Sequence, residues 1–266
     1  MILKPVAPCR WTTFAGPEWH NQGGALWGGF AIGVCIRVLE AEPEAVGEAL
    51  SLTLTYAAGL TSGDLDIRTR RLRQGGSIGV WEVELLAGGS DQVGVHAIVT
   101  LARRPVTPAF AFAKMPDVPS PERLPNPATP TGITYYAATA LEWRTLEGFP
   151  PKPDKSSRSL AWVRSPRRPL DKALLAMIAD NSPSRAVYAL GPTVMTTTLT
   201  LTVYLHATAA EVAEVGNDFV LVEYEGRVGG GGASDERSSY WTRDGKLLAT
   251  SEQLAWYRPR DPRPSE

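Results

Sequence analysis

The stretch that decides the fold of this chain reads Ala25-Leu26-Trp27-Gly28-Gly29-Phe30-Ala31-Ile32-Gly33-Val34-Cys35-Ile36. A helix of this composition is hydrophobic on nearly every side, whereas a helix on a protein surface keeps a polar face. A sheet wrapped around a central helix supplies burial on several sides. The small residues Gly28, Gly29 and Gly33 allow strands to approach the helix closely. The segment therefore predicts a buried helix enclosed by a curved antiparallel sheet, which is an α+β fold.

The same plan occurs twice along the chain, as one helix followed by four strands. In the first half the helix ends near Glu40, and the strand-like runs are 50–56, 64–73, 79–86 and 94–103. In the second half the helix is 170–179, and the runs are 196–206, 219–228, 233–241 and 247–258. In both halves the last two strands flank a tight polar turn, Gly88-Gly89-Ser90-Asp91 and Arg243-Asp244-Gly245-Lys246. This agreement predicts two related units.

A proline-dense segment separates the two units. Residues 105–130 contain eight prolines. Proline removes a backbone donor and restricts the residue before it, so this segment is predicted to be a surface linker. We therefore expect an N-terminal unit at 1–104, the linker at 105–130 and a C-terminal unit at 131–266. The second unit is expected to open with strands at 140–145 and 160–164 on either side of a polar loop at 150–158.

Composition excludes several classes of protein. The 266 residues are 43% hydrophobic and carry a formal charge of −1 at pH 7, which fits a soluble globular protein and offers no footprint for nucleic acid. The basic run Arg68 to Arg73 alternates like a strand and is interpreted as a solvated face. The two cysteines, Cys9 and Cys35, lack the spacing of a zinc site or a disulfide framework. No export signal or run of about 18 apolar residues is visible, so we expect a cytoplasmic protein without a membrane span.

Several short motifs occur in an order that resembles the acyl-CoA thioesterase II family. They are Gly23-Gly24 before the first helix, Trp162-Val163-Arg164, Ile178-Ala179-Asp180, the strand Thr198 to His206 and the closing stretch Arg243 to Gln253. Members of this family are double-hotdog proteins, so the resemblance implies two helix-wrapped antiparallel sheets joined into one continuous sheet. The run Gly229 to Gly232 departs from the family and predicts a bulge or kink in a strand.

The resemblance also implies a hydrolase that cleaves fatty acyl-CoA thioesters without a metal, a cofactor or a covalent intermediate. In this family an Asp after the second helix, a Thr on the following strand and a Gln on the last strand hold and activate a water molecule. The matching residues are Asp180, Thr198 and Gln253. A small register error would replace Thr198 by Thr196, Thr197 or Thr200. Each residue also has a structural interpretation, because Asp180 suits a helix end and the other two suit an ordinary strand.

The chemistry of these residue types fits thioester hydrolysis. A carboxylate polarises water as a general base, while a hydroxyl and an amide orient it. A backbone N–H at a helix start near Gly23 or Gly24 is a candidate for stabilising the oxyanion. His20, just ahead of them, is a candidate substrate contact or else a loop contact to backbone. Aligning the two hairpins places Ile98 opposite Gln253, so the polar set is predicted in the second unit only.

Two other functions stay open. A hotdog tunnel can hold an acyl chain without cleaving it, which predicts a non-catalytic acyl-CoA or acyl-carrier binding protein. A hydratase or dehydratase is disfavoured, because the chain lacks an Asp and His pairing near a Gly-Asp-x-Asn-Pro-type segment. The absence of a Gly-x-Ser-x-Gly elbow argues against a serine hydrolase. The expected partner is an acyl-CoA in lipid metabolism, and the resemblance makes a homodimer or homotetramer an alternative to a monomer.

Overall fold

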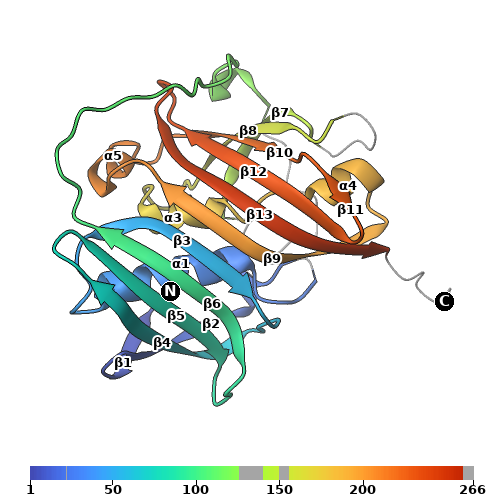
Figure 1. The fold of residues 1–266 in the computed structure, drawn as a ribbon. Coiled ribbons are helices and arrows are strands. Elements are labelled where there is room, and N and C mark those ends of the chain that lie inside the picture. The colour runs from blue at the N-terminus through green and yellow to red at the C-terminus, as the bar shows by residue number, and fades with distance from the viewer. Residues whose placement is uncertain (22, 126–139, 150–155, 260–266) are drawn as a thin grey trace.

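One continuous sheet forms most of the protein (Figure 1). The computed structural model describes residues 1–21, 23–125, 140–149 and 156–259. The strands of these ranges are β1 Leu3–Ala7, β2 Arg10–Ala15, β3 Glu48–Tyr56, β4 Gly63–Gln74, β5 Ile78–Ala87, β6 Val93–Ala102, β7 Glu142–Glu147, β8 Ser159–Arg164, β9 Val194–Leu205, β10 Val220–Glu225, β11 Gly229–Gly230, β12 Ala233–Trp241 and β13 Leu247–Pro259. They lie in the order β1-β2-β4-β5-β6-β3-β9-β13-β12-β10-β8-β7, with β11 paired to β12.

Strands β3 and β9 join the two halves at the centre of the sheet. Their pairing is antiparallel, with Thr53 opposite Thr202. The hydroxyl oxygens of these two threonines form a hydrogen bond of 3.0 Å across the junction. The ladder therefore runs without a break from the N-terminal half into the C-terminal half. The chain is a double hotdog, as the resemblance implied.

The helices α1 (Gly28–Ala41) and α3 (Lys172–Ile178) pack against each other on one side of the sheet (Figure 1). All residues of α3 and most of α1 are buried. A Cβ at Gly33 would lie 2.8 Å from Sδ of Met177, so this glycine permits the close approach of the two helices. The predicted buried helix is confirmed as α1. It packs on the sheet and also on α3, the helix of the other half.

Several elements were not predicted. They are β1, β2, the short helices α4 (Arg185–Leu190) and α5 (Ala209–Glu214), and the 3-10 turns η1 (Pro17–Trp19) and η2 (Pro121–Arg123). Of these, α5 had a usable signal, because Thr208 and Glu211 form a capping box at its start. The strands predicted from alternation are present with shifted ends, and the strand expected at 140–145 is β7.

The run Gly229 to Gly232 is a hairpin rather than a bulge. Strand β11 pairs with the first residues of β12, and Gly231 and Gly232 have φ values of 57° and 87°. These positive values suit glycine, because a Cβ is disfavoured there. The expected bulge or kink within a strand is therefore wrong. The strand predicted at 219–228 ends at Glu225, and the glycines build the turn into β12.

The proline-dense segment covers part of the outer face of the sheet. From 103 to 120 it contains no helix or strand. Met115, Val118 and Leu124 pack on a cluster formed by Leu160, Trp162, Phe219, Leu221 and Trp241. Residues 126–139 and 150–155 lie outside the described residues, and the boundaries at 104 and 130 stay predictions. In the described ranges no helix has both the length and the apolar character needed to cross a membrane.

Candidate active site

Asp180 lies where the end of α3 meets the start of α1. Its Oδ2 accepts a hydrogen bond from the backbone N–H of Gly29 at 2.9 Å. Its carbonyl oxygen accepts a bond of 2.7 Å from Nε1 of Trp27. The first turn of a helix has free N–H groups and a dipole that favours negative charge. The carboxylate on one half of the chain is thus held by the helix of the other half.

Thr198 on β9 and Gln253 on β13 complete a chain of hydrogen bonds to this carboxylate. Nε2 of Gln253 donates to Oγ1 of Thr198 at 2.7 Å, and Oγ1 of Thr198 donates to Oδ1 of Asp180 over a long 3.5 Å. The ladder between β9 and β13 is irregular between Leu254 and Ala255, next to this contact. The structure brings together the three side chains named from the sequence, and their catalytic roles stay a prediction. No described hydrogen bond joins Asp180 to Thr196, Thr197 or Thr200.

The pKa of Asp180 is raised to about 7. Burial is the main cause, because a low dielectric disfavours the charged form, and the negative charge of Glu236 adds to it. The hydrogen bonds from Gly29 and Thr198 oppose this rise. A carboxyl group that titrates near neutral pH is suited to general-base catalysis.

Gly28 and Tyr56, which the sequence did not single out for the site, close the space around this carboxylate. The hydroxyl of Tyr56 donates to the carbonyl of Gly28 at 3.2 Å. Burial and the nearby Asp180 raise the pKa of Tyr56, so its hydroxyl stays protonated. A Cβ at Gly28 would lie 2.7 Å from Oδ2 of Asp180 and 2.8 Å from the Tyr56 hydroxyl. The glycine therefore makes room for Tyr56 of β3, as expected for the close approach of a strand, and it also makes room for the carboxylate.

Gly23, Gly24 and His20 lie outside this cluster. The N–H of Gly23 donates to Oδ1 of Asn21 at 2.8 Å, and the N–H of Gly24 donates to the carbonyl of Asn21 at 3.1 Å. The backbone of His20 forms a bridge within the same turn. Because α1 begins four residues after Gly24, the expected helix start near these glycines is wrong. The N–H that faces the carboxylate belongs to Gly29.

The residue of the first half that corresponds to Gln253 is Val99 rather than Ile98. Thr53 of β3 and Thr202 of β9 lie opposite each other at the junction, so they are equivalent positions of the two halves. Thr53 lies opposite Ile98, and Thr202 lies opposite Glu252, so Ile98 corresponds to Glu252. The sequence alignment of the hairpins is therefore off by one residue, and such a slip moves a side chain to the other face of a sheet. Val99 is fully buried. In the first half, an apolar residue therefore occupies the position that corresponds to Gln253.

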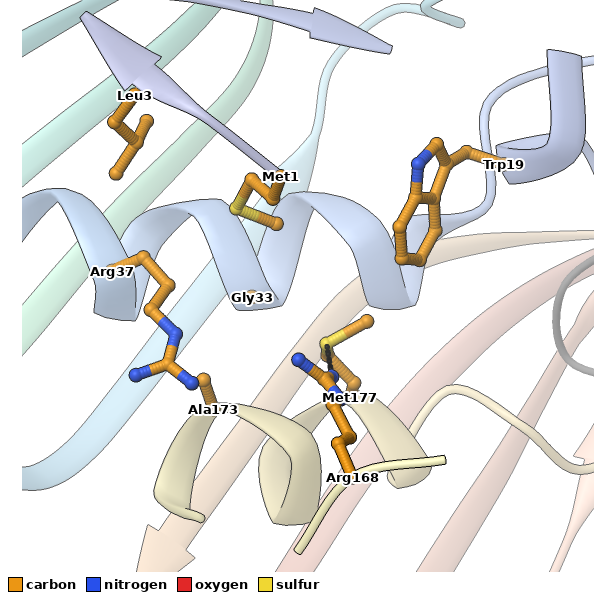
Figure 2. A pocket seen from close by; sticks show the side chains of 8 residues that line it. All are labelled: Met1, Leu3, Trp19, Gly33, Arg37, Arg168, Ala173 and Met177. Carbon is orange, nitrogen blue, oxygen red and sulfur yellow. Dashed lines mark hydrogen bonds between the residues drawn. The ribbon is translucent and has the colours of Figure 1, made fainter. Parts of the chain in front are cut away.

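A pocket of about 420 Å³ lies beside the contact between α1 and α3 (Figure 2). Its lining residues are Met1, Leu3, Trp19, Gly33, Arg37, Arg168, Ala173 and Met177. Along both helices this pocket is about one turn away from Gly29 and Asp180, and it does not include the three candidate residues. In the part of the chain that the structure describes, no group of three or more His, Cys, Asp or Glu side chains is placed to hold a metal ion.

Comparison with protein families assigns the chain. Residues 16–102 match the family model described as the acyl-CoA thioesterase N-terminal domain, and residues 114–257 match the one described as the C-terminal domain. The chain therefore belongs to the acyl-CoA thioesterase family. A search of curated proteins gives no significant match.

Solved structures share the whole fold. A hotdog protein of unknown function from Alicyclobacillus acidocaldarius has a TM-score of 0.90 and 25% identity, with 97% of this chain and 96% of that chain covered. An acyl-CoA thioesterase II from Mycobacterium marinum has a TM-score of 0.76 and 18% identity, with 98% and 97% covered. The dehydratase domain of PpsC from Mycobacterium tuberculosis has a TM-score of 0.54 and 11% identity, with 94% and 93% covered. Because a thioesterase and a dehydratase share the fold, the chemistry must be argued from the site.

Proposed function

We propose that the protein hydrolyses an acyl-CoA thioester to the free acid and CoA by direct attack of water. The observation that supports this most strongly is the hydrogen-bonded chain of Gln253, Thr198 and Asp180 at the start of α1. Membership of the acyl-CoA thioesterase family supports the substrate class.

In this proposal Asp180 is the general base. With its pKa raised to about 7, a large fraction is ionised at neutral pH and still accepts a proton well. Water attacks the carbonyl carbon as Asp180 takes its proton, and the tetrahedral intermediate then collapses with cleavage of the carbon–sulfur bond. The proton passes from Asp180 to the departing thiolate of CoA, which regenerates the carboxylate.

Thr198 and Gln253 orient the attacking water and the carbonyl. Because Thr198 accepts a hydrogen bond from Gln253, its own hydroxyl hydrogen is directed toward Asp180 or a water beside it. The amide of Gln253 keeps a second N–H, which stabilises negative charge as it develops on the thioester oxygen. Removal of either group is expected to slow the chemical step more than substrate binding.

Two of the three histidines and the buried cysteine are poorly suited to an acyl-enzyme route. His96 is bonded to Glu82, and His206 is bonded to Thr250, so neither activates a serine or cysteine. Burial raises the pKa of the Cys35 thiol to about 12, and a thiol of this kind is a poor nucleophile.

The test is thiol release from a panel of acyl-CoAs, from acetyl to palmitoyl plus an aromatic member, with the wild-type protein and Asp180→Asn. We expect the variant to lose about 10²- to 10⁴-fold in kcat. A matched control is Asp91→Asn, which changes an exposed carboxylate in the turn between β5 and β6 and should leave turnover intact. Unchanged turnover in Asp180→Asn would overturn the assignment of the base. Tight acyl-CoA binding without thiol release by the wild type would instead select a non-catalytic binding protein.

We propose a fatty acyl-CoA as substrate, a role in lipid metabolism and a cytoplasmic location, which the resemblance to the thioesterase II family supports. A homodimer or homotetramer is proposed on the same ground. The panel of chain lengths ranks the acyl groups directly, and sedimentation of the purified protein measures the assembly.

A further inference from the structure

Arg185 and Glu236 form a buried ion pair next to the candidate site. Nε of Arg185 lies 2.7 Å from Oε2 of Glu236, and the two side chains are 3% and 7% exposed. Removing two charges from water is costly, and an apolar pair of similar volume is often as stable. Stability alone therefore gives little reason for an ion pair at this position.

The first half of the chain fills the corresponding position without charge. In the second half Glu236 of β12 lies opposite Gln253 of β13. The corresponding pair in the first half is Trp81 of β5 opposite Val99 of β6, and both residues are fully buried. The two halves thus share one architecture, and the ion pair occurs in the half that carries Asp180.

Arg185 holds the loop that follows Asp180. Its guanidinium donates to the carbonyl of Pro183 at 2.6 Å and to the hydroxyl of Ser182. It also donates to the carbonyl of Ser157 at 2.7 Å, next to the start of β8. A single side chain therefore ties the loop after Asp180 to the strands of the same half. The planar guanidinium is suited to this, because it presents several donors in fixed directions.

Glu236 pairs with Arg185 and lies opposite Gln253 in the sheet. Residues that lie opposite each other in an antiparallel ladder point to the same face of the sheet, so Glu236 and Gln253 share the inner face. We propose that the Arg185–Glu236 pair positions Asp180 and Gln253 relative to each other for hydrolysis, an inference that rests on the proposed function. Neither residue is assigned a contact with the thioester, so both are positioning residues.

The electrostatics of the site support this role. The negative charge of Glu236 raises the pKa of Asp180, and the positive charge of Arg185 limits the rise in the pKa of Glu236 that burial causes. Other titratable groups also interact with the carboxyls of Asp180 and Glu236. They are Tyr56 on β3, Tyr188 on α4, Tyr224 on β10, and Asp235 and Tyr240 on β12. Removal of the Glu236 charge is therefore expected to make Asp180 more acidic.

The experiment compares kcat, KM and the pH profile of thiol release for the wild type and Glu236→Gln. We expect kcat to fall about 10- to 100-fold with a small change in KM, since the reacting groups are displaced. We also expect the acidic limb of the kcat/KM profile to move to lower pH. The control is Glu252→Gln, which removes an exposed ion pair with Arg227 beside Gln253 on the outer face and should leave both quantities unchanged.

A second variant keeps the test decisive if Glu236→Gln folds poorly. The double variant Arg185→Met, Glu236→Leu removes both charges together, so it leaves no unpaired buried charge. It should fold with a lower melting temperature, because the carbonyls of Ser157 and Pro183 lose their donors, and still show the loss in kcat. Wild-type kcat and an unmoved acidic limb in a folded variant would overturn the inference while the thioesterase assignment stands. A wild-type protein without thiol release would refute the proposed function itself.

Discussion

Gly28 sets how closely the start of α1 approaches the Asp180 carboxylate. In Gly28→Ala the new Cβ would lie 2.7 Å from Oδ2 of Asp180, whereas ordinary contact begins at 3.4 Å. The carboxylate must therefore retreat by about 0.7 Å, the difference between these two distances. This movement lengthens the 2.9 Å bond from Gly29 and shifts the base away from its water. Because misplacement of about 1 Å costs about 10²-fold in rate, we expect kcat to fall between 10- and 100-fold.

The same substitution should leave stability almost unchanged. Alanine is favoured over glycine in a helix by about 0.5 to 1 kcal/mol, and a weakened hydrogen bond to Asp180 costs about 1 kcal/mol. The two effects offset each other, and the atoms that must move are side-chain atoms, namely Oδ2 of Asp180 and the hydroxyl and Cε1 of Tyr56. The assay is thiol release at saturating acyl-CoA together with thermal unfolding, with Gly76→Ala as control because nothing lies within 4 Å of its new Cβ. A folded Gly28→Ala protein with wild-type kcat would refute the reasoning.

Because the base must be ionised, kcat/KM should fall about tenfold per unit below the Asp180 pKa of about 7; a flat profile from about pH 5 to 8 would contradict this. The folded pKa of Asp180 is raised above its unfolded value, so the native state binds more protons between about pH 4 and 7, and wild-type stability should fall as pH rises through this window. Asp180→Asn removes this loss of stability. Since Asp180 keeps partial solvent access, we expect the free energy of unfolding of the variant at pH 8 to exceed that of the wild type by about 1 to 2 kcal/mol. Urea unfolding measures this difference, and equal stability at pH 8 would oppose the burial argument. Lys172→Met should destabilise the fold by about 1 to 3 kcal/mol, because it leaves the Ala49 carbonyl and Glu48 without the bonds of 2.7 Å and 3.1 Å that Lys172 supplies. Its kcat should stay within about threefold of wild type, and unchanged unfolding would show that this contact does not stabilise the protein.

The elements that could be predicted from the sequence are those with a strong local signal. Helix α1 is apolar on nearly every side, and the long strands alternate, so both were found. Strand β1 is short and contains Pro5, which is tolerated at a sheet edge but conceals the strand pattern. Helix α4 has six residues, too few for helical periodicity to show.

The candidate site depended on the resemblance for its residues and on the fold for its geometry. Nothing local in the sequence shows that Gln253 reaches Thr198, since an irregularity of the ladder lies beside their contact. The pairing of Glu236 with Arg185 joins residues on α4 and β12, and only the tertiary fold brings these elements together. The sequence placed the start of α1 too early. Gly23 and Gly24 form a turn whose composition is like that of a helix N-terminus, but α1 begins at Gly28.

The most direct test of the central claim is a single turnover of an acyl-CoA in water enriched in heavy oxygen, followed by mass spectrometry of the acid and of the peptide that contains Asp180. If Asp180 activates water for direct attack, the released acid carries the heavy isotope after the first turnover and the peptide carries none. Label in the Asp180 carboxylate, with unlabelled acid in the first turnover, would show that this carboxylate attacks the thioester itself and would contradict the account.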